Sequence, residues 1–240
     1  MIRTLLMLAF WLLLVPLAAL IGFPWTFLSG KVDVLYWLGT RVAFAGVRVA
    51  GVKVKVVGLG SLDPAATYIF MSNHVSNLDP PILVPVIPRR TSVLVKKELF
   101  RVPILSRAMR LASLVPVERS NRDAAIASLR AASAVLARGI PMTIFVEGTR
   151  SFDGRLLPFK KGPFYLAMES GVPVVPVTIV GTHHILPKRR FSIRAGTATV
   201  VFHPPLNPQQ FSDRDALLAA VRDSIESALP DEYRTPVRSS

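Results

Sequence analysis

A run of 27 residues without a charged side chain, Thr4 to Gly30, constrains this chain more than any other feature of its sequence. The run is rich in Leu, Ala, Phe and Trp, and it exceeds the roughly 20 apolar residues that cross a hydrocarbon core. A cleaved signal peptide fits less well, because no small-x-small cleavage site precedes a polar segment. The sequence therefore predicts a membrane-embedded helical segment at the start of the chain.

The end of this apolar run contains two helix breakers. Gly22 and Pro24 are expected to bend or end the helix there. The following residues mix apolar side chains with Lys31, Trp37 and Arg41, which is typical of an interfacial helix. A single span followed by an interfacial helix and a helical hairpin in one leaflet are both possible. The hairpin is favoured because positive charge flanks both ends, and residues 1–50 are predicted to form the membrane anchor.

The whole chain is basic and apolar. It has 29 Lys and Arg against 15 Asp and Glu, a net charge of +14, and a mean hydropathy of +0.44. Such a surplus predicts an anionic partner. Because charged residues make up only 18% of the chain and aromatic residues 8%, anionic membrane lipids are favoured over nucleic acid. We expect a cell-membrane protein with its globular part at the cytoplasmic face. The absence of cysteine excludes disulfides and thiolate catalysis.

After residue 50 the pattern alternates between β-rich runs and amphipathic stretches. This alternation predicts one α/β domain over residues 51–229, with a mainly parallel central sheet flanked by helices, and a flexible tail over residues 230–240. Strands are expected at 52–58, 67–72, 91–97, 142–148 and 172–181, with one or two more in 191–203. Helices are expected to begin near Asp79, which would cap the first of them, and over 120–139, 162–171 and 212–229.

The segment "SNHVSNLDP" places His74 and Asp79 on a polar loop behind a strand. Residues five apart do not share a helix face, so the two side chains can meet only if the chain turns between them. Ser76, Asn77 and the Asp-Pro step supply such a turn. Asp79 could then hold one imidazole nitrogen and leave the other free as a base. Taken alone, a polar surface loop explains this spacing as well.

A second polar segment, "FVEGTRS", also follows a buried run. Gly148 lets the backbone approach a ligand, Thr149 offers a hydroxyl, and Arg150 offers a guanidinium matched to phosphate. The basic pair Lys160 and Lys161 comes shortly afterwards. A third basic cluster over residues 96–103, with Arg119 further on, follows another predicted strand. The ends of parallel strands meet at one edge of a sheet, where these clusters would face a single crevice.

Four blocks, "NHVSNLDP", "KKELFRVP", "FVEGTRS" and "VPVVPV", give the chain a family resemblance over roughly residues 67–180. It resembles the 1-acylglycerol-3-phosphate acyltransferase family, and so implies that family's fold. The resemblance implies His74 as the catalytic base and Asp79 as its partner. It implies phosphate binding by Glu147, Gly148, Thr149, Arg150, Lys97 and Arg119, supported by Asn73, Lys96, Lys160 and Lys161. It places Val172, Pro173, Val174, Val175 and Pro176 on the acyl-donor side, although a buried strand explains these residues equally well.

The implied reaction is acyl transfer from acyl-CoA or acyl-carrier protein to a lysophospholipid hydroxyl, with no cofactor and no metal. Val146 and Glu118 depart from the residues common in the family, which leaves glycerol 3-phosphate and a lyso-aminolipid open as other acceptors. The adjacent His183 and His184 have no third metal ligand at a useful spacing. A membrane-tethered protein that binds anions without chemistry is the alternative from a different class; its anion binding would depend steeply on salt and not on His74.

Overall fold

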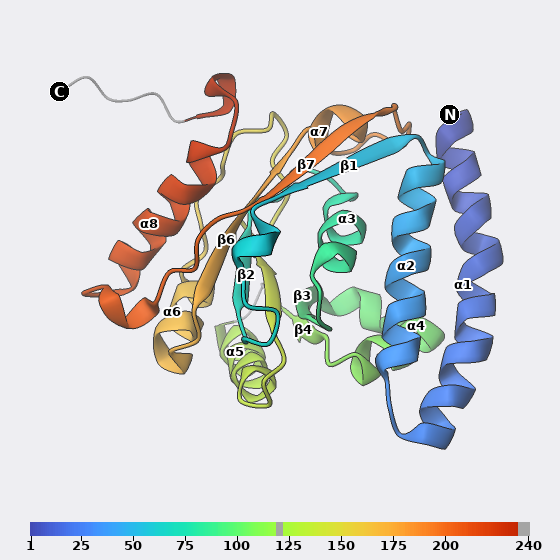
Figure 1. Cartoon of the computed structure of the whole chain (residues 1–240), viewed down its shortest axis with the longest axis horizontal. Helices are drawn as coiled ribbons and strands as arrows, with labels where there is room; N and C mark the ends of the chain where they lie inside the picture. Colours follow the sequence, from blue (N-terminus) through green and yellow to red (C-terminus); the bar gives the residue numbers. More distant parts are fainter. Residues whose placement is uncertain (119–121, 235–240) are drawn as a thin grey trace.

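A computed structural model describes residues 1–118 and 122–234. Its centre is a seven-stranded sheet in the order β1-β7-β6-β2-β5-β3-β4 (Figure 1). All neighbouring strands are parallel except β6 and β7, which confirms the predicted mainly parallel α/β sheet. The strands are β1 (Val52–Val57), β2 (Ile69–Ser72), β3 (Ser92–Lys96), β4 (Val115–Val117), β5 (Met142–Phe145), β6 (Val174–Val180) and β7 (Gly196–Phe202).

Helices cover both faces of this sheet (Figure 1). The α-helices are α1 (Ile2–Ser29), α2 (Asp33–Val49), α3 (Asp79–Val86), α4 (Pro103–Leu111), α5 (Arg122–Leu136), α6 (Lys161–Ser170), α7 (Thr182–Ile185) and α8 (Arg214–Ser227). The described residues also form the short 3₁₀ helices η1 (Leu59–Ser61), η2 (Lys97–Arg101), η3 (Pro208–Gln210) and η4 (Asp231–Tyr233). The expected cap of α5 at residues 120 and 121 lies outside the described residues.

Two hydrophobic cores lie on the two faces of the sheet because side chains alternate along each strand. In β2, Phe70 packs into one core, whereas Ile69 and Met71 pack into the other. The first core includes buried residues of α2 and α3, and the second includes buried residues of α6 and α8. Burial on both faces explains why β2, β5 and β6 read as continuous apolar runs rather than alternating ones.

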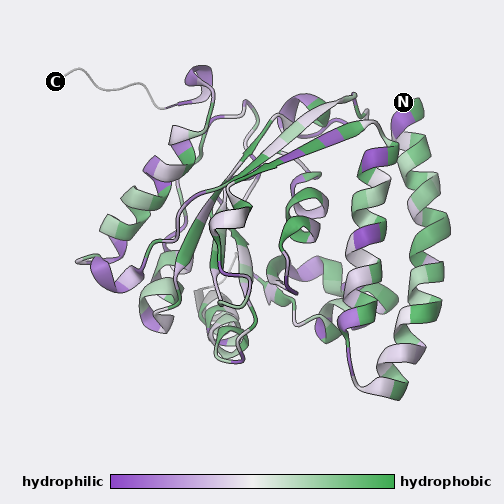
Figure 2. Ribbon diagram, in the orientation of Figure 1, coloured by the Kyte–Doolittle hydropathy of each residue, from purple (hydrophilic) through white to green (hydrophobic). Residues whose placement is uncertain are grey.

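The helix α1 does not end at Gly22 or Pro24 but continues through Pro16 and Pro24 to Ser29. A proline removes a single backbone hydrogen bond, which a long helix can tolerate. Within the described residues, α1 is the one helix long and apolar enough to cross a membrane. Most residues of α1 are hydrophobic (Figure 2).

The helices α1 and α2 pack side by side as a helical hairpin (Figure 1). Trp11 of α1 donates from its indole nitrogen to the carbonyl of Val42 in α2 at 3.2 Å, and a side chain at Gly46 would collide with this indole. The start of α1 is also tied to the loop before β7, because the Thr4 hydroxyl donates to the carbonyl of Phe191 and accepts from the amide of Ile193. Residues 191–195 form a loop, and β7 is the single strand within residues 191–203.

The end of β2 is fastened to its neighbour β6 by Asn73. The fully buried amide of this residue donates to the carbonyl of Ile179 at 2.9 Å and accepts from the amide of the same residue at 2.7 Å. A side chain thus continues the β2–β6 ladder for one step beyond the strand.

Replacing Asn73 by alanine should destabilise the protein by roughly 2 kcal/mol, because the backbone groups of Ile179 would lose their partners in a buried place. Thermal unfolding in detergent would measure this loss. Asn77→Ala, which alters an exposed residue of the same loop, is the matched control and should stay within about 0.5 kcal/mol of the parent. Equal stability of the two variants would contradict the fastening role of Asn73.

Candidate active site

The loop between β2 and α3 brings His74 and Asp79 together. The imidazole Nδ1 lies 2.8 Å from Asp79 Oδ2, and the same oxygen accepts the backbone amides of Val75 at 2.7 Å and Ser76 at 2.8 Å. These amides make the bend that a spacing of five residues requires. Asp79 was expected to cap the helix, but α3 begins at Asp79 itself and its carboxylate turns back to the preceding loop, so that prediction is wrong.

The second oxygen of the Asp79 carboxylate accepts the hydroxyl of Thr182 at 2.6 Å. Thr182 begins α7, directly behind β6, and both side chains are fully buried. Thr182 is absent from the sequence-based candidates because it lies 103 residues from Asp79. A polar residue at the end of a buried strand is the one sequence signal that could have found it.

The imidazole of His74 is partly open to solvent and well oriented. Its side chain is 17% exposed, and its ring stacks on Phe145 with centroids 4.3 Å apart. Because Nδ1 is held by Asp79, the tautomer with the proton on Nδ1 leaves Nε2 as an acceptor. Nε2 forms no hydrogen bond with the described part of the chain, so it can take a proton from a ligand.

The Glu147 carboxylate is buried and faces the backbone. One oxygen accepts the amide of His74 at 2.8 Å and the other accepts the amide of Leu157 at 3.0 Å. Burial raises the pKa of Glu147 from its ordinary value near 4.5 to about 7, although the two amides act against this shift. With 1% of the residue exposed and both oxygens bonded to backbone amides, Glu147 holds the His74 backbone in place.

The segment after β5 turns sharply and returns to His74. Gly148 has a φ of +71°, which suits glycine, and its amide donates to the carbonyl of Phe145 at 3.1 Å. Two residues after Thr149, the Ser151 amide donates to the His74 carbonyl at 2.8 Å. Arg150 therefore lies beside the His74 loop, half-buried, and its guanidinium forms no ion pair within residues 1–118 and 122–234.

Lys188 braces this segment from the loop behind α7. Its ammonium donates to the carbonyl of Arg150 at 2.6 Å, lies 3.5 Å from the Thr149 hydroxyl, and sits 3.8 Å from the centre of the Phe152 ring. Partial removal from water lowers the pKa of Lys188, and the positive charges of Arg150 and Arg189 lower it further. The sequence-based candidates do not include Lys188. The basic run Lys188 to Arg190 was the available signal.

Most of the other basic candidates are paired with acidic side chains. Lys97 follows β3 and pairs with Glu118 at 2.6 Å, and Lys96 pairs with Glu98 at 3.3 Å. Lys161 pairs with Asp215 of α8 at 3.2 Å, which directs it to another element than those that hold His74. Lys160 is exposed just before α6. Arg119 lies outside the described residues.

The register of the sheet shows which candidates share an edge. Phe70 of β2 and Val93 of β3 both align with Thr143 of β5. Four residues further along these parallel strands lie His74, Lys97 and Glu147. By contrast, Val174, Val175 and Pro176 belong to β6 and are buried in the cores, and Val172 and Pro173 are half-buried before it. A buried strand thus accounts for Val174, Val175 and Pro176.

The histidines behind β6 contact a segment expected to belong to the flexible tail. His183 and His184 each lie within 3.0 Å of the Tyr233 hydroxyl through their Nε2 atoms. Tyr233, within the segment expected to be a flexible tail, therefore packs against α7. The described residues contain no cluster of three or more side chains of the His, Cys, Asp and Glu types that could hold a metal ion.

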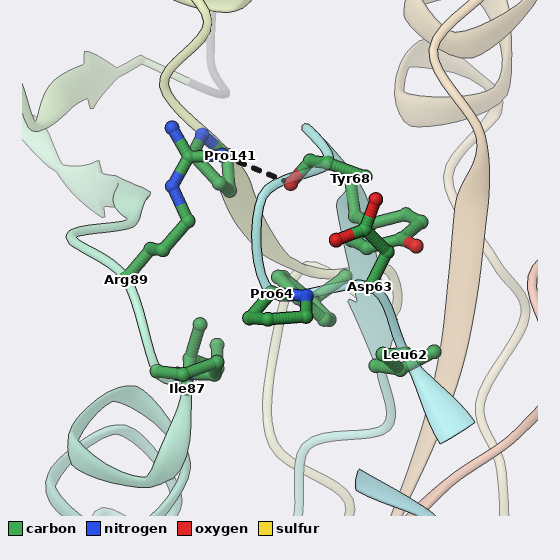
Figure 3. A pocket seen from close by; sticks show the side chains of 10 residues that line it. Leu62, Asp63, Pro64, Tyr68, Ile87, Arg89 and Pro141 are labelled. Carbon is green, nitrogen blue, oxygen red and sulfur yellow. Dashed lines mark hydrogen bonds between the residues drawn. The ribbon is translucent and has the colours of Figure 1, made fainter. Parts of the chain in front are cut away.

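A small hollow at the other edge of the sheet does not belong to this site (Figure 3). It lies before β2 and β5 and is lined by residues that include Leu62, Tyr68, Ile87 and Pro141. Its volume of about 10 Å³ accommodates about one water molecule. Arg89 lines it and ties the two loops together by donating to the carbonyls of Ala66 and Gly139, each at 3.1 Å.

Comparison of the sequence and the fold with known proteins shows the family to which the chain belongs. The family model described as Acyltransferase matches residues 53–180, which contain the His74 loop and the segment after β5. In the solved structures, the 1-acyl-sn-glycerophosphate acyltransferase PlsC from Thermotoga maritima superposes with a TM-score of 0.77 at 28% sequence identity, covering 92% of each chain.

Curated relatives carry the same name. A 1-acyl-sn-glycerol-3-phosphate acyltransferase from Limnanthes douglasii is 35% identical over 190 residues, which is 79% of this chain and 66% of the relative. The human 1-acyl-sn-glycerol-3-phosphate acyltransferase alpha is 31% identical over 178 residues, which is 73% of this chain and 63% of the relative. The chain thus spans slightly less than two thirds of the length of these relatives.

The raised pKa of Glu147 gives the protein a measurable pH dependence. The folded state holds this proton up to about pH 7, whereas the unfolded chain releases it near pH 4.5, so the contribution to stability is full below pH 4.5 and is lost as pH rises to about 7. The difference corresponds to about 3 kcal/mol. Thermal unfolding would be followed between pH 4.5 and 8 for the parent and for Glu147→Gln. The stability contributed by Glu147 should fall with rising pH in the parent and be absent from the variant. Parallel curves for the two proteins would contradict it.

Proposed function

Because the chain belongs to the Acyltransferase family, we propose that it transfers a fatty acyl group from a thioester to the free sn-2 hydroxyl of 1-acylglycerol 3-phosphate, giving phosphatidic acid. One observation carries this proposal. A histidine held by a buried carboxylate lies on the same sheet edge as the half-buried Arg150, which has no ion-pair partner in the described part of the chain. The first group suits proton removal and the second suits a phosphate.

In the proposed reaction His74 acts as general base. Its Nε2 removes the proton of the acceptor hydroxyl as that oxygen attacks the thioester carbonyl. The carbon–sulfur bond then breaks, and the imidazolium returns the proton to the departing thiolate. Asp79 orients the ring through Nδ1 and stabilises its charged form. The acceptor oxygen is itself the nucleophile, so an acyl-enzyme is not needed, in keeping with a chain that has no cysteine.

The phosphate of the acceptor would bind the segment after β5. Arg150 offers a planar fork of donors, and Lys188 adds a second positive charge beside the Arg150 carbonyl. Fixing the phosphate there positions the hydroxyl against His74, and such positioning can contribute as much as the proton transfer. Lys97 and Arg119 would assist, and Glu147 would act indirectly through the His74 backbone.

The donor would be acyl-CoA or acyl-carrier protein, and no cofactor is needed. Acceptor and product are both membrane lipids, so the proposed site belongs at a bilayer. We place the protein in the cell membrane through α1, with the domain of residues 51–229 at the cytoplasmic face and in contact with anionic lipids. The long apolar helix and the net charge of +14 support this location.

Replacing His74 by alanine should lower turnover by about 10²–10⁴-fold if Nε2 is the base. Purified protein would be given one labelled acyl-CoA and a panel of 1-acylglycerol 3-phosphate, glycerol 3-phosphate and a lyso-aminolipid, with 1-acylglycerol 3-phosphate expected to be the preferred acceptor. His203→Ala changes an imidazole that bonds to Thr178 and is the matched control. If the His74 variant turned over at a rate close to that of the control, His74 would not be the general base.

Removing the side chain of Arg150 should raise the acceptor KM by roughly tenfold or more, because a charged contact to phosphate is lost. The KM for the acyl donor should not change. Steady-state kinetics with each substrate varied in turn would separate the two, and Arg214→Ala, on α8, serves as the control. A change confined to the donor KM would show that Arg150 does not bind the acceptor.

A further inference from the structure

A group of large apolar side chains is exposed on η2 and α4. These side chains lie within one stretch of the chain, and the most exposed is Ile104 at 68%. The exposed residues are Leu99, Val102, Ile104, Leu105 and Leu111, and we call the surface formed by residues 96–111 the η2–α4 patch. Contiguous apolar surface of this kind marks an interaction site on a soluble domain.

The helix α4 keeps this surface outward. Met109 is buried against the body of the domain, whereas Ile104 and Leu111, seven residues apart, share another face that is open to solvent. The pattern in sequence is therefore that of an amphipathic helix whose apolar residues only partly serve the core. Polar replacements at Ile104 would leave the core intact.

Positive charge is interleaved with these apolar side chains. Residues 96–111 contain five Lys and Arg and a single acidic residue, Glu98, which pairs with Lys96. In the part of the chain that the structure describes, Arg101, Arg107 and Arg110 form no ion pair, and Arg110 lies over the Phe100 ring at 5.5 Å. Apolar side chains flanked by arginines match the boundary between acyl chains and anionic headgroups.

The position of the patch relates it to the site. It begins directly at the end of β3, on the sheet edge where the His74 loop and the Arg150 segment also begin. A surface held to a bilayer at this edge would open the site toward lipid rather than toward bulk water.

We propose that the η2–α4 patch inserts its apolar side chains into the interfacial layer of a membrane containing anionic lipid, as a second point of attachment beside α1. Insertion of the patch does not require the proposed reaction. What rests on the proposed function is the consequence that a lysophospholipid reaches His74 without leaving the bilayer.

The absence of cysteine allows a direct test. Full-length Ile104→Cys, labelled with an environment-sensitive fluorophore, is reconstituted in vesicles of phosphatidylcholine with and without phosphatidylglycerol. We expect a blue-shifted emission that brominated acyl chains quench, more strongly with phosphatidylglycerol present. Ala219→Cys, exposed on α8, is the matched control and should report water. Water-like emission at residue 104 in both kinds of vesicle would overturn the proposal, as would a blue shift that appears only when acyl-carrier protein is added.

A kinetic arm addresses the consequence for the reaction. The double variant Ile104→Asp, Leu105→Asp should lose roughly tenfold in rate with vesicle-borne acceptor, because two apolar side chains would no longer insert into the membrane interface. Its rate with a short-chain, water-soluble acceptor should match that of the parent. Equal losses with both acceptors would overturn the delivery role. If neither protein turned over any acceptor, the proposed function would fail while the fluorescence result still decided insertion.

Discussion

The buried carboxylate of Asp79 accepts four hydrogen bonds, from His74, from the amides of Val75 and Ser76, and from the hydroxyl of Thr182. An ionised carboxylate away from water is costly unless its oxygens are satisfied, so these donors must all be in place. They come from the loop after β2 and from Thr182, the first residue of α7, and the Asn73–Ile179 bonds hold the ends of β2 and β6 together. The orientation of the imidazole is therefore a property of the whole sheet edge.

A second buried carboxylate completes this arrangement. The amides of His74, Val75 and Ser76 are consecutive, and all three donate to carboxylates, the first to Glu147 and the other two to Asp79. A loop that lacks regular structure is thus fixed by two acidic side chains rather than by a backbone ladder. In the proposed reaction, the cations Arg150 and Lys188 would receive the phosphate of the acceptor, while the carboxylate of Asp79 supports the base.

Sequence patterns predicted much of this structure where the signal is local. Apolar runs located β2, β5 and β6, and turn residues between His74 and Asp79 indicated the bend that joins them. Long-range partners were out of reach, because nothing near Asp79 points to Thr182 and nothing near Arg150 points to Lys188. The tendency of Pro24 to end a helix was overridden in α1, which continues to Ser29. The short elements β4 and α4 were not predicted, since three to nine residues carry little periodicity.

The bond between Thr4 and the loop before β7 has a consequence for biosynthesis. Thr4 is 187 residues from Phe191 and 189 from Ile193. As the ribosome builds the chain from its amino end, the first helix emerges long before the loop that receives it. The hairpin of α1 and α2 can pack on α3 and β1 while the later part of the chain is still being made. We expect the docking of Thr4 on this loop to be among the last contacts to form.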